Sequence, residues 1–248
     1  KELLEKVTEN VIEHGVDLQF ETTVNTIEKL KDRLQIQTSS GQLQTDMVIV
    51  STGVRPNAEL AVEAGIKVGK SGAILIDEYM QTNMENIFAA GDCAEHNHIV
   101  LDESRWVPMA PSANKGGRVA GENMAGAKIR FPGILGTAVS KVFDYTIAQT
   151  GLTEKQARKI QTLGEFETTT IKAGSRAHYY PGSQPVTVKL VVDKNTRRVL
   201  GAQMVGMAGV AKRLDVLATA ITAKMTVEDI GMLDLTYAPP FAPVYDPI

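Results

Sequence analysis

The sequence predicts an α/β fold in its N-terminal half, followed by a separate α+β unit. Helical and strand patterns alternate up to residue 124, which is typical of a sheet covered by helices. Met47–Val50 is a continuous apolar run, as expected of a strand buried on both faces of a parallel sheet. Beyond residue 132, strand patterns separated by polar turns dominate instead.

The first fifty residues predict one helix and several short strands. Leu3, Val7 and Val11 recur at helical spacing. Gly15 supplies a stop, so we expect a helix over residues 1–14. Alternating apolar and polar residues predict strands at 17–20, 24–30 and 33–38, with a turn at Ser40–Gly41 leading into a further strand at Leu43.

The next region predicts a short helix, two strands and a long helix. The short helix covers 59–64, and the strands cover 73–77 and 87–90. The long helix begins near Pro111–Ser112, where Ser112 is expected to cap it, and runs to Met124. Gly116–Gly117 inside this helix cost about 1 kcal/mol each relative to alanine. We therefore expect another segment to pack closely on the helix backbone there.

A change in the residue pattern at residues 125–132 marks the predicted boundary of the α+β unit. Thr153 and Gln156 form a capping box that opens a helix through Lys159. Thr226 caps the last helix. The remaining elements follow from alternation and helical spacing: paired strands 139–143 and 145–150, a strand 166–171, a hairpin of 186–192 with 199–205, and helices 210–224 and 227–233.

Composition and charge exclude several classes of protein. The formal net charge is −3 and the sequence contains no dense basic run, which argues against a nucleic-acid surface. It contains no apolar stretch long enough for a membrane span, and its first residues do not resemble a signal peptide, so we expect a cytoplasmic protein without membrane contact. The single cysteine, Cys93, rules out an intrachain disulfide.

The most informative segment for chemistry runs from Thr82 to Asp92. An apolar strand that ends in Gly91–Asp92 places a carboxylate at the carboxyl edge of a sheet, where ligands bind in open α/β folds. The whole segment resembles the second flavin-binding motif, T-x4-hydrophobic-G-D, of the FAD-dependent pyridine nucleotide-disulfide oxidoreductases. The resemblance implies that Asp92 accepts a hydrogen bond from the ribityl chain of FAD, with Thr82 and Gly91 also at the cofactor.

Three further motifs resemble this family in the same order. Asp46–Asn57 is similar to the A-T-G segment that joins the nicotinamide and flavin domains, with Ser51 in place of alanine. Ala110–Arg118 is similar to the helix whose start abuts the flavin ring. Tyr237–Phe241 resembles the Y-A-P-P-F/Y of the coenzyme A disulfide reductase and NADH oxidase branch. In that branch the tyrosine approaches the flavin of the other subunit, so the resemblance implies a homodimer.

The helix near Pro111 has a physical reason to lie at the flavin. A helix N-terminus favours negative charge, and reduced flavin carries negative charge on its ring. We therefore expect four residues at the start of this helix to contact the cofactor: Pro111, Ser112, Ala113 and Asn114. Backbone groups of Ala113 and Asn114 are expected to stabilise reduced flavin.

The resemblance implies a FAD-binding, Rossmann-like domain followed by a dimerisation domain. Residues 1–50 match the end of the NAD(P)-binding domain, 51–127 the end of the FAD-binding domain and 128–248 the dimerisation domain. The sequence lacks the G-x-G-x-x-G loops that hold the pyrophosphates of FAD and NADH or NADPH. It also lacks the family's redox cysteine, so it contains no catalytic residue of its own. We expect it to be an internal piece of a protein about twice as long.

The implied reaction moves hydride from NADH or NADPH to FAD and on to a disulfide such as coenzyme A disulfide. One alternative is an NADH oxidase or peroxidase that reduces oxygen or peroxide. Another is a dimerisation and partial FAD-binding module without activity.

The electron acceptor depends on positions that depart from the branch pattern. Tyr245 stands where coenzyme A disulfide reductases carry a lysine that contacts coenzyme A, and Asn114 where some members use a histidine. Lys212 or Arg213 could replace that lysine. The loop with Tyr179 and Tyr180, preceded by His178, resembles a substrate-site loop of the branch; the alternative is an aromatic turn.

Two further kinds of residue are expected to have no chemical role. Cys93 directly follows the flavin aspartate and is expected to be packed rather than redox-active. His96 and His98 are expected in a solvated loop rather than in a metal site, because no third ligand is apparent.

Overall fold

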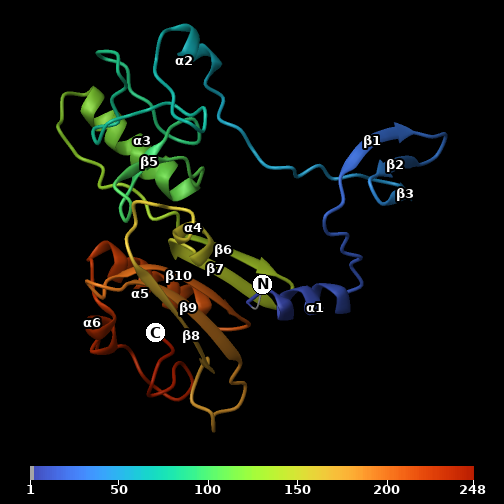
Figure 1. Cartoon of the computed structure of the whole chain (residues 1–248), viewed down its shortest axis with the longest axis vertical. Coiled ribbons are helices and arrows are strands. Elements are labelled where there is room, and N and C mark those ends of the chain that lie inside the picture. Colours follow the sequence, from blue (N-terminus) through green and yellow to red (C-terminus); the bar gives the residue numbers. More distant parts are fainter. Residues whose placement is uncertain (1–2) are drawn as a thin grey trace. The chain divides into compact units, whose positions relative to one another are not determined.

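The computed structural model describes residues 3–248 (Figure 1). Its contacts divide the chain into two units, of which one spans Thr8–Arg55 and the other combines the residues up to Val7 with Pro56–Ile248. Lys1 and Glu2 of the predicted first helix lie outside the described residues. No helix of the described part is long and apolar enough to cross a membrane. The domain boundaries near residues 50 and 127 stay predictions.

The unit Thr8–Arg55 is built on a three-stranded antiparallel sheet in the order β1-β2-β3. Its strands are β1 (Val24–Lys29), β2 (Leu34–Thr38) and β3 (Gly41–Thr45). The predicted turn at Ser40–Gly41 is confirmed, since Thr38 pairs with Gly41 and its hydroxyl donates to the Gly41 carbonyl at 2.8 Å. The predicted strand at 17–20 is wrong, because no strand forms there.

The prediction of a buried strand at Met47–Val50 is also wrong. The segment has no strand structure, and the exposed fractions of Met47, Ile49 and Val50 are 70%, 80% and 70%. A strand buried on both faces needs hydrogen-bond partners at its edges and helices over its faces. The sheet of this unit ends with β3 at Thr45 and supplies neither.

Helix α1 (Glu5–Glu13) lies within the predicted range 1–14, and its residues are divided between the two units. Val7 is buried with Tyr145 and Val205. These two residues come from strands of the C-terminal sheet, so the first turn of α1 covers one face of it.

Residues 56–124 contain less regular structure than the sequence predicts. Helix α2 (Glu59–Glu63) forms as expected, and α3 (Ala110–Met124) forms with an earlier start than predicted. The strands predicted at 73–77 and 87–90 are reduced to isolated bridges, at Ile74 with Ala94 and at Phe88 with Gln81. Each of these bridges pairs one residue with one other residue, so neither forms the repeated hydrogen bonds of a β-ladder. An unpredicted hairpin joins β4 (His96–His98) and β5 (Glu103–Arg105).

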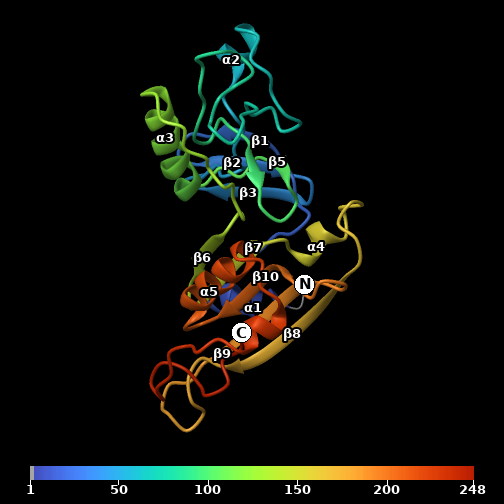
Figure 2. The same cartoon turned by 90° about the vertical axis from the view of Figure 1, so that its left-hand side faces the viewer.

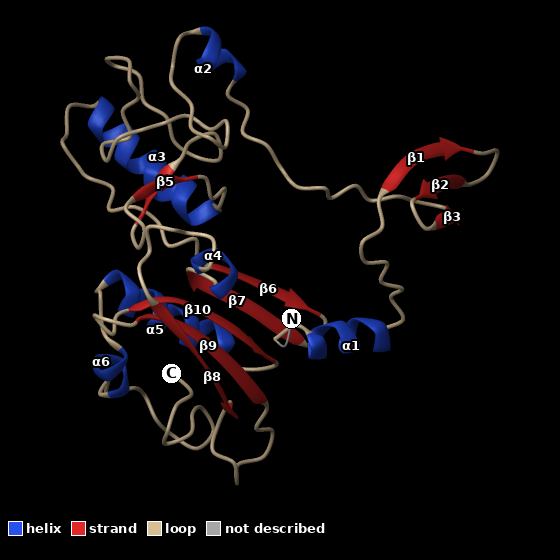
Figure 3. Ribbon diagram, viewed as in Figure 1, coloured by secondary structure: helices blue, strands red, loops and turns tan. Residues whose placement is uncertain are grey.

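The C-terminal part contains a five-stranded antiparallel sheet in the order β6-β7-β10-β9-β8 (Figures 2 and 3). All the predicted strand pairs of this part are confirmed: β6 (Ala138–Val142) with β7 (Tyr145–Gly151), and β9 (Pro185–Asp193) with β10 (Val199–Gly206), while β8 (Phe166–Gly174) adds an edge. Helix α5 (Val210–Thr222) packs across β7 and β10. Side chains alternate along each strand, so the core under α5 and the cluster around Val7 use opposite faces.

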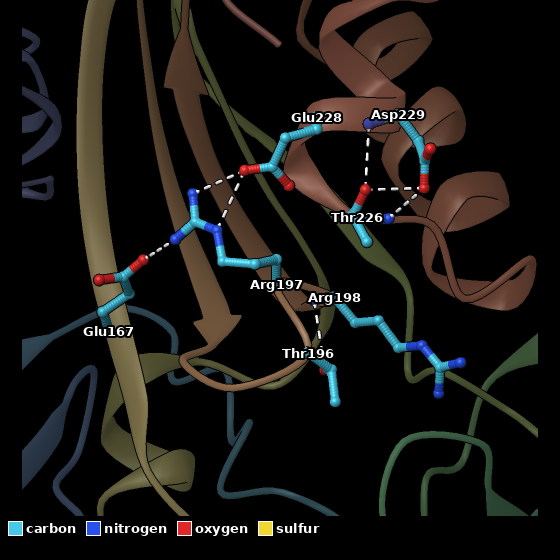
Figure 4. A network of polar contacts seen from close by, with 7 residues as sticks. All are labelled: Glu167, Thr196, Arg197, Arg198, Thr226, Glu228 and Asp229. Carbon is cyan, nitrogen blue, oxygen red and sulfur yellow. Dashed lines mark hydrogen bonds and ion pairs between the residues drawn. The ribbon is translucent and has the colours of Figure 1, made fainter.

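Capping boxes define the two short helices of this part. Thr153 and Gln156 open α4 (Glu154–Ala157), which is two residues shorter than predicted. Thr226 and Asp229 open α6 (Val227–Gly231), as Figure 4 shows.

An ion-pair network ties α6 to the edge strand β8. Arg197, in the turn between β9 and β10, bridges Glu167 of β8 and Glu228 of α6 (Figure 4). A hydrogen bond from the backbone of Glu228 itself, and next the hydrogen bond from Arg197, lower the pKa of Glu228. The network therefore joins three segments at the surface.

Candidate functional site

The Gly91–Asp92 turn presents an exposed carboxylate on a fixed backbone. Gly91 has φ +86°, a conformation that L side chains rarely adopt, and a Cβ placed there would meet no other atom within 4 Å. The Asp92 side chain is exposed. The indole Nε1 of Trp106 donates to the Asp92 carbonyl at 2.8 Å. No motif in the sequence points to Trp106, because its hydrogen-bond partner is a backbone atom.

Helix α3 packs against the segment that leads into this turn. A Cβ at Gly116 would lie 3.2 Å from Cε1 of His96, 3.3 Å from Sδ of Met80 and 3.8 Å from Cβ of Ala90. The expectation of close packing is therefore confirmed at Gly116. It is wrong at Gly117, where a Cβ would meet open space.

The start of α3 differs from the prediction by three residues. Met109 is the N-cap residue and Pro111 lies in the first turn, where proline is favoured. Ser112 is therefore not the cap; it is buried, and its hydroxyl donates to the Met109 carbonyl at 2.7 Å.

The Ala113 N–H donates to the same Met109 carbonyl at 3.0 Å, so it is already engaged within the helix. Helix geometry instead leaves the N–H groups of Ala110 and Ser112 without an intrahelical acceptor. Asn114 is exposed on the next turn.

The first turns of α3 border a cavity of about 1010 Å³. Pro111, Ser112 and Lys115 line one side of it, and Leu214 and Ala218 of α5 line another. Arg130 adds a second cation to the rim. The volume lies at the upper limit of the range typical of small-molecule sites, about 300–1,000 Å³.

Thr82 has a structural position in the same region. It is buried, its hydroxyl donates to the Met84 carbonyl at 3.3 Å, and the Met84 N–H donates back to it at 3.2 Å. Thr82 therefore closes the turn that precedes the Gly91 segment, and a direct contact with a cofactor stays a prediction.

The C-terminal part brings two predicted tyrosines together. A hydrogen bond with Tyr179 raises the pKa of Tyr237 above its ordinary value. Both side chains are exposed, and the segments that carry them are also joined by a hydrogen bond from the Ala177 N–H to the Pro239 carbonyl at 3.3 Å. Tyr180 lies nearby in sequence, with the Arg176 guanidinium 6.0 Å from its ring centroid.

The two cations proposed as substitutes for a missing lysine have different environments. Tyr245 is 90% exposed, so its side chain is open to solvent. The expectation that Arg213 could replace the missing lysine is wrong, because Arg213 is 1% exposed and paired with Asp246. Lys212 is exposed, with its Nζ 3.4 Å from the Phe241 carbonyl. Lys212 is therefore the candidate of the two.

Cys93 is partly buried against an apolar cluster that includes Ile74, and its Sγ lies 3.5 Å from the Ala90 carbonyl, as expected for a packed thiol. The solvated loop predicted for His96 and His98 is wrong, because both histidines are buried on β4, with exposed fractions of 2% and 5%. The unpredicted hairpin with β5 is the reason.

Burial lowers the pKa of both histidines. The ring of His96 packs edge-on against Phe131, with 5.3 Å between centroids, and neither of its nitrogens has a partner among the described residues. No group of three or more metal-ligating side chains occurs in residues 3–248.

Two family models match the chain. The first, described as pyridine nucleotide-disulphide oxidoreductase, matches residues 1–117. The second, described as the dimerisation domain of the pyridine nucleotide-disulphide oxidoreductases, matches residues 137–246. Together they account for the Rossmann-like and α+β parts that the sequence predicts.

Individual relatives support the same assignment. A Pyrococcus furiosus protein named NAD(P)H sulfur oxidoreductase (CoA-dependent) is 44% identical over 248 residues, which are 100% of this chain and 55% of that protein. A Methanocaldococcus jannaschii NADH oxidase is 39% identical over 222 residues, which are 88% of this chain and 48% of that protein. The chain thus spans about half the length of the curated relatives it matches.

The structural comparison agrees with these matches. The solved structure of an NAD-dependent persulfide reductase from A. fulgidus has a TM-score of 0.91 and 44% identity, over 97% of this chain and 44% of that one. The fold class predicted from the sequence is therefore confirmed. On the two family models, the chain belongs to the pyridine nucleotide-disulphide oxidoreductase family.

Proposed function

We propose that the protein containing this chain is a flavoenzyme that passes hydride from NADH or NADPH to FAD and then reduces a sulfur–sulfur bond, such as that of coenzyme A disulfide. The observation that carries the proposal is the exposed Asp92 carboxylate on the left-handed Gly91 turn. Ala90, just before this turn, lies against Gly116 of α3, and the first turn of that helix supports a site for a hydroxyl-bearing, partly anionic cofactor.

The residues of this chain bind and orient the cofactor. Asp92 accepts a hydrogen bond from a ribityl hydroxyl, and Trp106 holds the backbone of that turn. The N–H groups of Ala110 and Ser112 favour negative charge at the first turn of α3, and the neighbouring side chains of Pro111, Ala113 and Asn114 shape the same end of the helix. FAD supplies the hydride and electron chemistry when bound.

The names of relatives guide the choice of electron acceptor. The P. furiosus and A. fulgidus proteins are named for sulfur and persulfide reduction, and the former is described as CoA-dependent. The Tyr179–Tyr237 pair, with Tyr180 and Tyr245 nearby in sequence and Lys212 as a cation, offers exposed aromatic and positive groups for such an acceptor. The M. jannaschii relative, named NADH oxidase, favours oxygen or peroxide as the second candidate.

A homodimer is part of the proposal. Residues 137–246 match a dimerisation domain, and the segment after Tyr237 exposes several large apolar side chains: Tyr237, Phe241, Val244 and Tyr245. In a dimer, Tyr237 would approach the partner's flavin. A cytoplasmic location stays a prediction of the sequence.

The test is a visible absorption spectrum of the intact protein before and after anaerobic addition of NADH. We expect flavin bands that bleach, and Asp92→Ala is expected to purify with less flavin than the wild type. A colourless protein that stays colourless with added FAD would exclude the flavoenzyme. Bleaching without turnover of any disulfide or persulfide, but with consumption of oxygen, would select the second candidate. If the 248-residue chain alone is colourless while the intact protein is yellow, this chain is a partial module.

A further inference from the structure

Arg213 is a buried charged residue for which the proposed chemistry has no direct use. It lies in the first turn of α5 and is 1% exposed. Its Nε donates to Oδ1 of Asp246 at 2.6 Å, and its Nη2 donates to Oδ2 at 2.8 Å. This bidentate geometry fixes both the distance and the plane of the two groups.

The same guanidinium also binds two backbone carbonyls. Nη2 donates to the Ser175 carbonyl at 3.1 Å, and Nη1 donates to the Gly209 carbonyl at 3.0 Å. Gly209 makes room for it, because a Cβ there would lie 2.3 Å from Nη1 of Arg213. A buried ion pair is often no more stabilising than apolar residues of similar volume, so its value here is better sought in geometry than in stability.

Arg213 joins the two segments that carry Tyr179 and Tyr237, which the hydrogen bond from the Ala177 N–H to the Pro239 carbonyl at 3.3 Å also links. Ser175 begins the loop that leads to Tyr179, and Asp246 ends the segment that starts at Tyr237. The loop is closed by hydrogen bonds from the Ser175 N–H to the Gln184 carbonyl at 2.7 Å and from the Gln184 N–H to Ser175 Oγ at 3.0 Å. A shift at Ser175 would therefore displace the loop as a body.

We propose that Arg213, paired with Asp246, is a positioning residue that sets the Tyr179 loop against the Tyr237 segment, so that both hydroxyls face one electron acceptor. The positioning itself rests on the contacts above, and its link to an acceptor rests on the proposed function. Arg213 acts through the two segments and touches no reacting atom.

The first test measures the tyrosine pair and requires no turnover. The intact protein is labelled with ¹³Cζ-tyrosine, and the pKa of Tyr237 is followed by NMR, its signal being assigned by Tyr237→Phe. Tyr179→Phe removes the hydrogen bond and sets the reference shift. We expect Arg213→Lys, which cannot reproduce the bidentate pair, to lower the Tyr237 pKa by most of that reference shift.

A matched control separates positioning from a general loss of charge. Arg158, whose side chain is exposed, pairs with Glu154 in the same unit, and Arg158→Lys is expected to leave the Tyr237 titration unchanged. If Arg213→Lys fails to fold, Asp246→Asn keeps the shape of the partner and is titrated in its place. A Tyr237 titration identical to wild type in the folded variant would overturn the proposal.

The second test uses the intact enzyme. We expect Arg213→Lys to lower kcat/KM for coenzyme A disulfide about 10- to 100-fold, the effect of misplacing groups by about 1 Å. Flavin reduction by NADH should keep its wild-type rate, and a parallel loss of that rate would indicate a merely structural role. If the enzyme contains no flavin but the NMR result holds, the proposed function fails while the positioning stands.

Discussion

The indole of Trp106 and the backbone of Asp92 are joined by a hydrogen bond of 2.8 Å, although fourteen positions separate them in the sequence. Trp106 directly follows β5, and Asp92 lies just before β4. The unpredicted hairpin therefore has a consequence for the proposed cofactor site. It holds the turn that presents the Asp92 carboxylate.

Trp106→Phe is predicted to loosen this turn. The lost hydrogen bond costs about 0.5–1.5 kcal/mol, which corresponds to roughly a 2- to 10-fold weaker binding of FAD if the bond is maintained in the holoenzyme. Titration of the apoenzyme with FAD, followed by flavin fluorescence, gives the measurement. Unchanged affinity would show that the turn is held by other contacts.

Gly116 and Gly117 offer a matched pair of substitutions in α3. Gly117→Ala faces open space and is predicted to stabilise the chain by up to about 1 kcal/mol. Gly116→Ala brings a methyl group against His96 and Met80, and overpacking costs about 1–3 kcal/mol. Urea unfolding should therefore rank Gly116→Ala below Gly117→Ala. Equal stability of the two variants would mean that the neighbours of Gly116 yield without cost.

The buried histidines predict a loss of stability in acid. Burial lowers the pKa of His96 and His98 below their ordinary value of 6.5, so the unfolded chain binds more protons than the folded chain as the pH falls below that value. The free energy of unfolding should thus be maintained above pH 6.5 and decline below it.

His96→Leu is predicted to flatten this pH dependence, because it removes a protonation site whose nitrogens have no partner among the described residues. His178→Gln, at an exposed loop position, is the control and should keep the wild-type slope. Urea unfolding at a series of pH values measures it. An unchanged slope in His96→Leu would assign the acid sensitivity to other groups.

The Arg197 network is predicted to contribute little. All three of its side chains are largely exposed, at 45% for Arg197, 48% for Glu167 and 61% for Glu228. Arg197→Gln should therefore cost little stability. The cost should shrink further in about 1 M salt, where charges are screened within about 3 Å. A larger, salt-independent loss in thermal unfolding would contradict this.

Lys212→Met is predicted to weaken binding of an anionic acceptor. Lys212 is the exposed cation beside Phe241, and loss of one such contact should raise KM for coenzyme A disulfide about tenfold, equivalent to 1.4 kcal/mol, with kcat nearly unchanged. Steady-state kinetics of the intact enzyme measure both. Lys224→Met, beyond the end of α5, is the control and should have no effect.

The elements that the sequence predicted well depend on local contacts. The hairpin of β9 and β10 follows from alternation on either side of a polar turn, and Thr153 and Thr226 reach acceptors only three residues away. Such interactions are fixed by neighbouring residues, so the pattern alone is sufficient.

The features that the sequence did not predict depend on distant partners. The segment around His96 is predicted as a solvated loop, and nothing in its sequence indicates that Phe131 and Gly116 would bury the histidine. Similarly, the sequence indicates the positive charge of Arg213 but not its contacts with Ser175 and Asp246, which lie more than thirty positions away. Of the candidate site, the motifs and the tyrosine loop could be named, but not the pairing of Tyr179 with Tyr237.

The exposed Met47–Val50 segment has a practical consequence for work with this chain. Its residues are strongly apolar and β-prone, carry no charge, and belong to no strand of the described residues. Short segments of this kind nucleate intermolecular β-pairing. Preparations of the 248-residue chain should therefore self-associate as concentration rises, and replacing Ile49 by lysine should delay the onset of light scattering.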